Sequence, residues 1–147
     1  MIITKSSLFD EDQIKAFEEA KDAKYIFETC IKDKHGSWAN DLFAIFYQET
    51  PHPRGSNYFA IYYDYATHKL MIADGISATE PFMGAVAKNG DIIFSRYRHD
   101  MRSSPDKSVI IDGGRDYVKL SLVDNYEPKL VRLRVIKDKL EIMNEGE

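Results

Sequence analysis

Residues 41–65, DLFAIFYQETPHPRGSNYFAIYYDY, contain two short runs rich in aromatic and β-branched residues, separated by a loop with prolines and a glycine. Runs of this kind, bounded by turn residues, are typical of β-strands. The pattern continues in segments 24–33, 41–49, 57–65, 68–74, 84–88, 91–98, 108–112, 115–123, 129–136 and 139–143. Because the loops between them are short, we expect a mostly antiparallel β-sheet of hairpins arranged as a meander.

The first part of the chain instead predicts one helix, over residues 10–23. Asp10, followed three residues later by Gln13, is typical of an N-terminal capping box. Ile14 and Phe17 then fall three apart and give the helix an apolar face. The predicted fold class is therefore α+β, with the N-terminal helix packed on the antiparallel sheet.

Turns and loops give the expected organisation. Asn89-Gly90 suits a tight hairpin, and Lys137-Asp138-Lys139 separates the last two predicted strands. The longest breaks, 49–56 and 100–107, are loops that could border a site. The sequence has no fixed-period repeat and no linker, so we expect a single domain, 1–147.

Composition disfavours several classes of protein. With 20 basic and 24 acidic residues the formal net charge is -4, which disfavours general nucleic-acid binding. The one cysteine, Cys30, cannot form an internal disulfide, and its apolar neighbours indicate a buried thiol. The N-terminus lacks a signal-peptide pattern, and no apolar run approaches the ~20 residues of a membrane span. We therefore expect a cytoplasmic protein.

Basic side chains are concentrated in FSRYRHDMR (94–102) and DGGRDYVK (112–119). They are Arg96, Arg98, His99, Arg102, Arg115 and Lys119. If 92–99 is a strand, its alternation places Arg96 and Arg98 on one face, opposite Tyr97 and His99. By the same rule Arg115, Tyr117 and Lys119 share one face of a later strand. Neighbouring strands with these faces on the same side would bring four cations and a tyrosine together.

Such a patch suits a phosphate-bearing ligand with an aromatic base, because arginine matches phosphate oxygens and an aromatic ring can stack. Gly113-Gly114, directly before Arg115, favours this interpretation, since glycines let a backbone approach a ligand or supply positive φ. The alternative is a solvated sheet face, on which Asp100, Asp112 and Asp116 neutralise the arginines as ordinary surface pairs.

Two other functions stay open. His99-Asp100 could be a general base with its orienting carboxylate, as in a small phosphodiesterase or nucleotide hydrolase. The other histidines show no metal-ligand spacing, and the chain lacks a P-loop, GxGxxG and GxSxG, so we expect no cofactor and no metal site. The second alternative is an inhibitor that binds an acidic host-protein surface through the basic patch.

Three further side chains each have two interpretations. Trp38 either caps the core or forms an exposed stacking platform. Arg54, in the loop PHPRGSN, either reaches a phosphate or belongs to a rigid hairpin connection. Phe82 either lies in the core or stands near the mouth of the basic patch.

At SRYRHDMR (95–102) and IDGGRDYVK (111–119) the chain resembles the phage anti-Thoeris sponge proteins of the first type, which sequester cyclic ADP-ribose signals. The resemblance is strongest over residues 92–120. It implies two phosphates held by Arg115 and by Lys119, where the family has arginine, with Phe82 and Asn89 as the nearest matches to its other contacts. It also implies binding without turnover, in a pocket at an interface of a homo-oligomer, a dimer or larger.

We therefore expect a non-catalytic protein that binds a cyclic nucleotide and inhibits bacterial anti-phage defence, with no nucleic-acid or membrane partner. Arg98, Arg102, Arg115 and Lys119 would hold phosphates. Tyr97 and Tyr117 would stack or hydrogen-bond, and His99 with Asp116 would orient these groups or bind ribose hydroxyls. The expected ligand-binding residues are Phe82, Arg96, Tyr97, Arg98, His99, Arg102, Arg115, Asp116, Tyr117 and Lys119.

Overall fold

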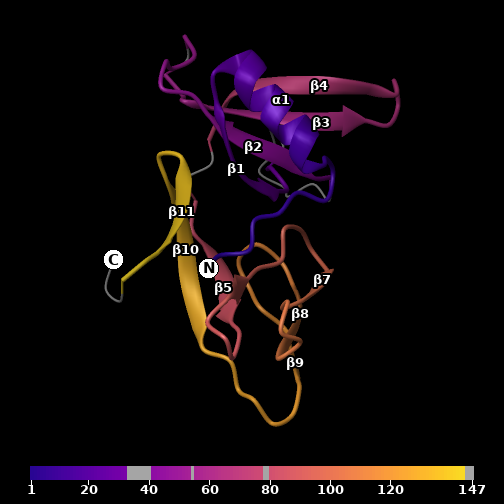
Figure 1. The fold of residues 1–147 in the computed structure, drawn as a ribbon, viewed down its shortest axis with the longest axis vertical. Coiled ribbons are helices and arrows are strands. Elements are labelled where there is room, and N and C mark those ends of the chain that lie inside the picture. The colour runs from indigo at the N-terminus through magenta and orange to yellow at the C-terminus, as the bar shows by residue number, and fades with distance from the viewer. Residues whose placement is uncertain (33–40, 54, 78–79, 145–147) are drawn as a thin grey trace.

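The computed structural model describes residues 1–32, 41–53, 55–77 and 80–144 (Figure 1). Its elements in chain order are α1 (Glu11–Lys21), β1 (Lys24–Thr29), β2 (Phe43–Tyr47), β3 (Tyr58–Asp64), β4 (Lys69–Ile76), β5 (Phe82–Val86), β6 (Ile92–Ile93), β7 (Asp100–Ser103), β8 (Val109–Gly113), β9 (Leu120–Leu122), β10 (Leu130–Ile136) and β11 (Lys139–Ile142). One short helix followed by strands in antiparallel sheets confirms the predicted α+β class.

The helix begins and ends where its cap residues require. Asp10 Oδ1 accepts a hydrogen bond from Gln13 N (2.8 Å), while Asp10 N donates to Gln13 Oε1 (2.9 Å), so the predicted capping box is confirmed. The helix ends at Lys21, and its C-cap residue, Asp22, adopts a left-handed conformation with φ 49°. Phe17 packs edge to face against Phe9 and Phe46, which fixes the helix on one side of the first sheet.

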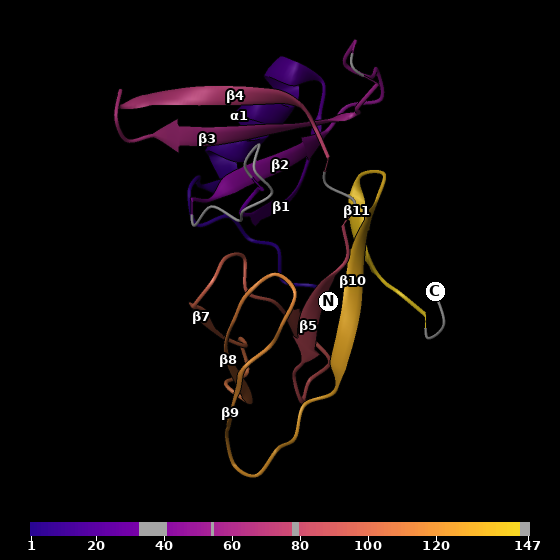
Figure 2. The ribbon, with the colours of Figure 1, turned by 180° about the vertical axis from the view of Figure 1, so that it is seen from behind.

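The first sheet has the order β1-β2-β3-β4 and is the expected meander. Its alternation is clearest in β2, where Ala44 and Phe46 pack toward α1. Phe43 and Ile45 face the opposite way, into the largest core cluster. The helix therefore lies over one face of the sheet (Figures 1 and 2), while the opposite face of β2 belongs to the main core.

The second sheet has the order β11-β10-β5-β6, so β10 pairs with a strand distant in sequence. A simple meander does not contain such a pairing, and the expected meander is wrong for this sheet. Phe27 of the first sheet stacks on Phe82 of the second, with ring centroids 5.5 Å apart, and Phe82 also contacts Phe94. The main core therefore lies between these two sheets.

A third sheet, β7-β8-β9, packs against the second through Val109 and Ile111, which contact Ala85 and Ile93. The hairpins predicted at Asn89-Gly90 and at Lys137-Asp138 are both confirmed, as the pairs β5–β6 and β10–β11.

Two predicted strands are wrong over the residues that matter most for function. β6 ends at Ile93, so 94–99 is not a strand and Arg96 and Arg98 do not share a strand face. The chain leaves the sheet there because the Asp100 carboxylate accepts from Arg96 N (2.9 Å), which holds a turn. Likewise β9 begins only at Leu120, so Arg115, Tyr117 and Lys119 lie in a loop.

The N-terminal segment, residues 1–9, connects the two main sheets. Ile92 N donates to Met1 O and Ile3 N to Ile92 O, both at 2.9 Å, next to the second sheet. The segment then crosses to the first sheet, where Ser7 N and Leu8 N donate to the Glu28 carboxylate. Figure 1 shows this crossing in indigo. Within the described parts of the chain, the structure contains no helix long and apolar enough to cross a membrane.

Candidate functional site

Arg96 lies in an ion cluster that is almost closed to solvent. Its Nε and Nη2 donate to Asp100 Oδ2 (2.8 Å) and Oδ1 (3.1 Å), and Nη1 donates to Glu28 Oε2 (3.0 Å). The three side chains are only 11%, 4% and 1% exposed, in the order Arg96, Asp100, Glu28. Burial opposes the charged form, but the hydrogen bonds and charge of Asp100 raise the pKa of Arg96 above its ordinary value. The guanidinium of Arg96 therefore binds carboxylates of the protein itself.

Glu28 completes this cluster from β1. Its carboxylate accepts from Ser7 N (3.0 Å) and Leu8 N (3.0 Å), and from the hydroxyl groups of Ser6 and Ser7. A buried carboxylate is tolerated only when it is paired and hydrogen-bonded in this way. The cluster joins the N-terminal segment, β1 and the loop 94–99.

Arg102, on β7, is half-buried. Its Nη1 donates to Phe94 O (3.2 Å), and its Cζ lies 5.7 Å from the centroid of the Phe94 ring. Burial, and next the charge of Arg96, lower the pKa of Arg102. Arg102 therefore contacts Phe94 through both a hydrogen bond and its ring face.

Arg115 is buried, with 6% of its surface exposed. Its Cζ lies 4.4 Å from the ring centroid of Phe82 and 5.9 Å from that of Phe27, and Nη2 donates to Glu80 O (3.4 Å). Burial lowers the pKa of Arg115 to about 10. Phe82 itself is 1% exposed, so of its two interpretations the structure supports the core position.

Gly113 and Gly114 are explained by Tyr117. A Cβ atom on Gly113 would lie 2.5 Å from Tyr117 O, and one on Gly114 would lie 2.7 Å from the Tyr117 ring. Gly114 N also donates to Tyr117 O (3.1 Å). The glycine pair therefore accommodates a turn of the chain over itself, and this close approach accounts for both residues.

His99 is 67% exposed and its nearest carboxylate is that of Asp112, with Nδ1 and Oδ1 3.7 Å apart. Asp100, its predicted partner, instead accepts from Arg96 through both carboxylate oxygens. Asp112 N donates to Lys119 O (2.8 Å), so the exposed Lys119 lies on the neighbouring segment. Arg98, Asp116 and Tyr117 are exposed as well.

Three tyrosines line a pocket of about 200 Å³, which we call the tyrosine pocket. Its residues come from the N-terminal segment, the segment directly before β2, the β3–β4 hairpin and the loop after β6: Leu8, Asp41, Leu42, Tyr63, Tyr65 and Tyr97. The rings of Tyr63 and Tyr65 meet edge to face at 4.9 Å, and Arg96 Cζ lies 5.8 Å from the Tyr97 centroid. Of the predicted site residues, this pocket includes Tyr97.

The other members of the tyrosine pocket were not predicted from the sequence. The dense tyrosines of 58–65 were a signal, but Tyr63 and Tyr65 are distant from Tyr97 in sequence and meet it only through the fold. Asn89, in contrast, lies in its turn with Nδ2 donating to Asp91 Oδ2 (3.1 Å). Trp38 and Arg54 lie outside the described residues.

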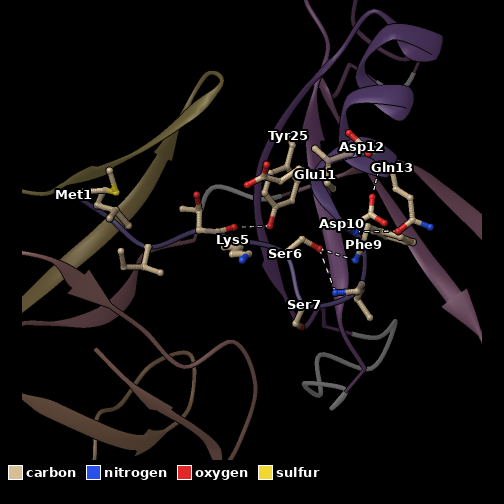
Figure 3. Close-up of a pocket in the computed structure, with 15 residues that line it drawn as sticks. Met1, Lys5, Ser6, Ser7, Phe9, Asp10, Glu11, Asp12, Gln13 and Tyr25 are labelled. Atoms are coloured by element: carbon tan, nitrogen blue, oxygen red, sulfur yellow. Dashed lines mark hydrogen bonds between the residues drawn. The ribbon is translucent and has the colours of Figure 1, made fainter. Parts of the chain in front are cut away.

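A second hollow, of about 1010 Å³, runs beside the N-terminal segment and the start of α1 (Figure 3). Its polar groups are largely used within the protein, since Tyr25 Oη donates to Thr4 O (2.7 Å) and Asp10 caps the helix. Burial, and next the charge of Glu28, raise the pKa of Tyr25. This hollow is open, and its lining carries Lys5 as well as the carboxylates of Asp10, Glu11 and Asp12.

Comparison of the chain with protein-family models, with curated proteins and with solved structures gives no match.

Proposed function

We propose that this protein is a non-catalytic binding protein that sequesters a compact nucleotide in the cytoplasm and holds its base in the tyrosine pocket. The observation that supports this most directly is the grouping of Tyr63, Tyr65 and Tyr97 around one cavity. An aromatic ring stacks on any nucleobase, with roughly 1–3 kcal/mol per base. Leu8 and Leu42 add apolar lining, as is usual in small-molecule sites.

The loop that follows Tyr97 favours an anionic ligand. Arg98 and His99 come directly after Tyr97 and are exposed, so their donors are available to phosphates. Asp41, at the edge of the pocket, is an acceptor for ribose hydroxyls or for the amino group of a base. Arg96 is engaged with carboxylates, and in this proposal it orders the loop that presents Arg98.

The resemblance of residues 92–120 to the anti-Thoeris sponges narrows the proposed ligand to a cyclic ADP-ribose isomer. The biological role would then be the removal of an immune signal, which inhibits bacterial anti-phage defence. We also propose that the ligand is bound without turnover and that exposed cations contact its phosphates.

A thermal-shift screen tests the proposal. The purified protein is melted in the presence of cyclic ADP-ribose isomers, cyclic di- and trinucleotides, NAD or short oligonucleotides. Any bound compound is then released by heat and identified by mass spectrometry. A ligand that binds only the folded state raises the melting temperature by mass action. We expect a shift with one cyclic nucleotide, recovered intact.

Two variants localise the site. Tyr65→Ala removes a pocket wall that is 68% exposed, and Met101→Ala truncates a side chain that is 69% exposed on β7. We expect the first to abolish the ligand-induced shift and the second to retain it. An unchanged shift in Tyr65→Ala, or no shift with any compound, would overturn the proposal. A chemically altered product would overturn its non-catalytic part.

A further inference from the structure

β4 (Lys69–Ile76) is the outer strand of the first sheet and, at eight residues, a long one. Among the described residues it pairs with β3 alone, in a register that sets Ile61 opposite Ile72 and Tyr63 opposite Leu70. Within the part of the chain that the structure describes, no second strand lies along the other side of β4. An edge of this kind can add a further strand.

The side chains of β4 make this edge unusually apolar. Leu70, Met71 and Ile72 are consecutive and are 48%, 39% and 41% exposed. Proteins normally protect an edge strand with charges, proline or a bulge placed along it. Here Lys69 stands at one end and the irregularity near Gly75 at the other, so the middle of the strand is unprotected.

We propose that β4 is a homodimer interface, in which β4 of one copy pairs antiparallel with β4 of a second copy about a twofold axis perpendicular to the sheet. This symmetry keeps each side chain on the face that it has in the single chain. Because opposed residues share a face and faces alternate along a strand, the residue numbers of two opposed residues sum to an even number. Only a few registers then overlap most of the strand, and the sequence distinguishes them.

A register centred on Met71 is favoured. It sets Leu70 of each copy opposite Ile72 of the other, on the face that also bears Tyr63, and it sets Lys69 opposite Ala73. Within β4 this register pairs residues 69–73 of the two copies. Apolar cross-strand pairs stabilise a sheet.

The neighbouring registers are worse. Centring on Ile72 would set Leu70 opposite Asp74, an apolar side chain against a carboxylate. Centring on Leu70 would set Lys69 opposite Met71 and would shorten the paired stretch. Self-complementarity at the Met71 register therefore identifies a second copy as the partner. The result is one continuous sheet, with both α1 helices and both tyrosine pockets on the same face.

Light scattering of the full chain tests the dimer. We expect the wild type to have twice the 16.9 kDa chain mass. Ile72→Lys places a cation in the apolar centre of the interface and should give a monomer. The control Met101→Lys, at a side chain with 69% exposure on β7, should remain dimeric. A monomeric wild type, or a dimer unaffected by Ile72→Lys, would overturn the proposal.

Cross-linking tests the register. Met71 lies on the proposed axis, so the two copies of residue 71 face each other. In Met71→Cys their Cα atoms should therefore lie within the separation of about 4.4–6.8 Å that a disulfide needs. The oxidant diamide would convert the two thiols to one disulfide. The two protons and two electrons that the thiols lose reduce diamide to its hydrazine. Cys30 is buried and should not interfere.

Leu70→Cys is the matched control, because the two copies of residue 70 would be displaced along the strands. We expect at least ten times more covalent dimer from Met71→Cys than from Leu70→Cys. Equal yields, or more dimer from Leu70→Cys, would overturn the register. This outcome is independent of the ligand, so it can fail while the proposed nucleotide binding holds.

Discussion

Arg96 and Asp100 form a two-point ion pair, in which Nε donates to Oδ2 over 2.8 Å and Nη2 to Oδ1 over 3.1 Å. The same guanidinium reaches Glu28 on β1. Because an arginine fork matches a carboxylate in shape, this arrangement orients the loop 94–99 relative to the first sheet. The most basic stretch of the chain is therefore arranged partly by its own carboxylates.

Removing the charge of Arg96 should destabilise the protein strongly. In Arg96→Met two almost buried carboxylates, Glu28 and Asp100, would lose their cation, and breaking a buried pair in this way costs about 3–5 kcal/mol. Urea denaturation would measure the change in the free energy of unfolding. Arg98→Ala, at an exposed arginine of the same loop, should change it by less than about 0.5 kcal/mol. Equal losses would contradict the structural role of Arg96.

Gly113→Ala should cost more stability than Gly90→Ala. A Cβ atom on Gly113 meets Tyr117 O at 2.5 Å, so the backbone must shift, with a loss of about 3 kcal/mol. A Cβ atom on Gly90 meets nothing within 4 Å, and its φ of 96° alone costs about 1 kcal/mol. Thermal unfolding of the two variants measures the difference. The reverse order would be evidence against the close turn at Tyr117.

Cys30 should react slowly with thiol reagents in the folded protein. The side chain is 2% exposed, and burial raises the pKa of its thiol. The reagent therefore has little access to the sulfur, and a smaller fraction of the thiol is present as the reactive thiolate. Labelling with Ellman's reagent at neutral pH should be slow in buffer and rapid in urea. Met101→Cys, with an exposed thiol on β7, supplies the fast comparison. Fast native labelling of the wild type would show that β1 opens readily at its end.

Acid should destabilise the fold partly through Asp106. Hydrogen bonds, first from Ser104 Oγ (2.7 Å) and then from Ser108 N and Oγ, hold the pKa of Asp106 well below its ordinary value. In the unfolded chain the pKa is about 3.9, so the carboxylate adds stability above that pH. This contribution is lost as the pH falls toward the folded-state pKa.

Melting temperatures of the wild type and of Asp106→Asn, measured from pH 7 to pH 2, check this sign. The variant should be less stable at pH 7, and the gap should narrow below pH 4 as the wild type loses its advantage. A gap that stays constant over this range would mean that Asp106 contributes through its shape alone.

Much of the fold followed from local sequence. The capping box fixed the start of α1, and alternation placed β2 and β3, because half-buried strands have a period of two. The loops 94–99 and 114–119 resisted prediction, since their aromatic and β-branched residues favour strands. Tertiary contacts override that preference there, through Asp100 at the first loop and Tyr117 at the second.

The candidate site was harder to predict than the fold. Tyr97 was selected from sequence, but its partners Tyr63 and Tyr65 meet it through a packing of loops that no local pattern encodes. Burial of Arg115 against Phe82 was equally invisible, because a charged residue between glycine and aspartate has the pattern of a surface residue.

Glu28 has a consequence for the order in which the chain folds. Its cation, Arg96, is 68 residues further along, and the bond from Arg96 to Ser7 spans 89 residues. Early in synthesis the first sheet can form hairpins from neighbouring strands, but its buried carboxylate lacks a counter-ion until Arg96 leaves the ribosome. Closure of the core between the first two sheets should therefore come late, and contacts this distant in sequence slow the step that completes it.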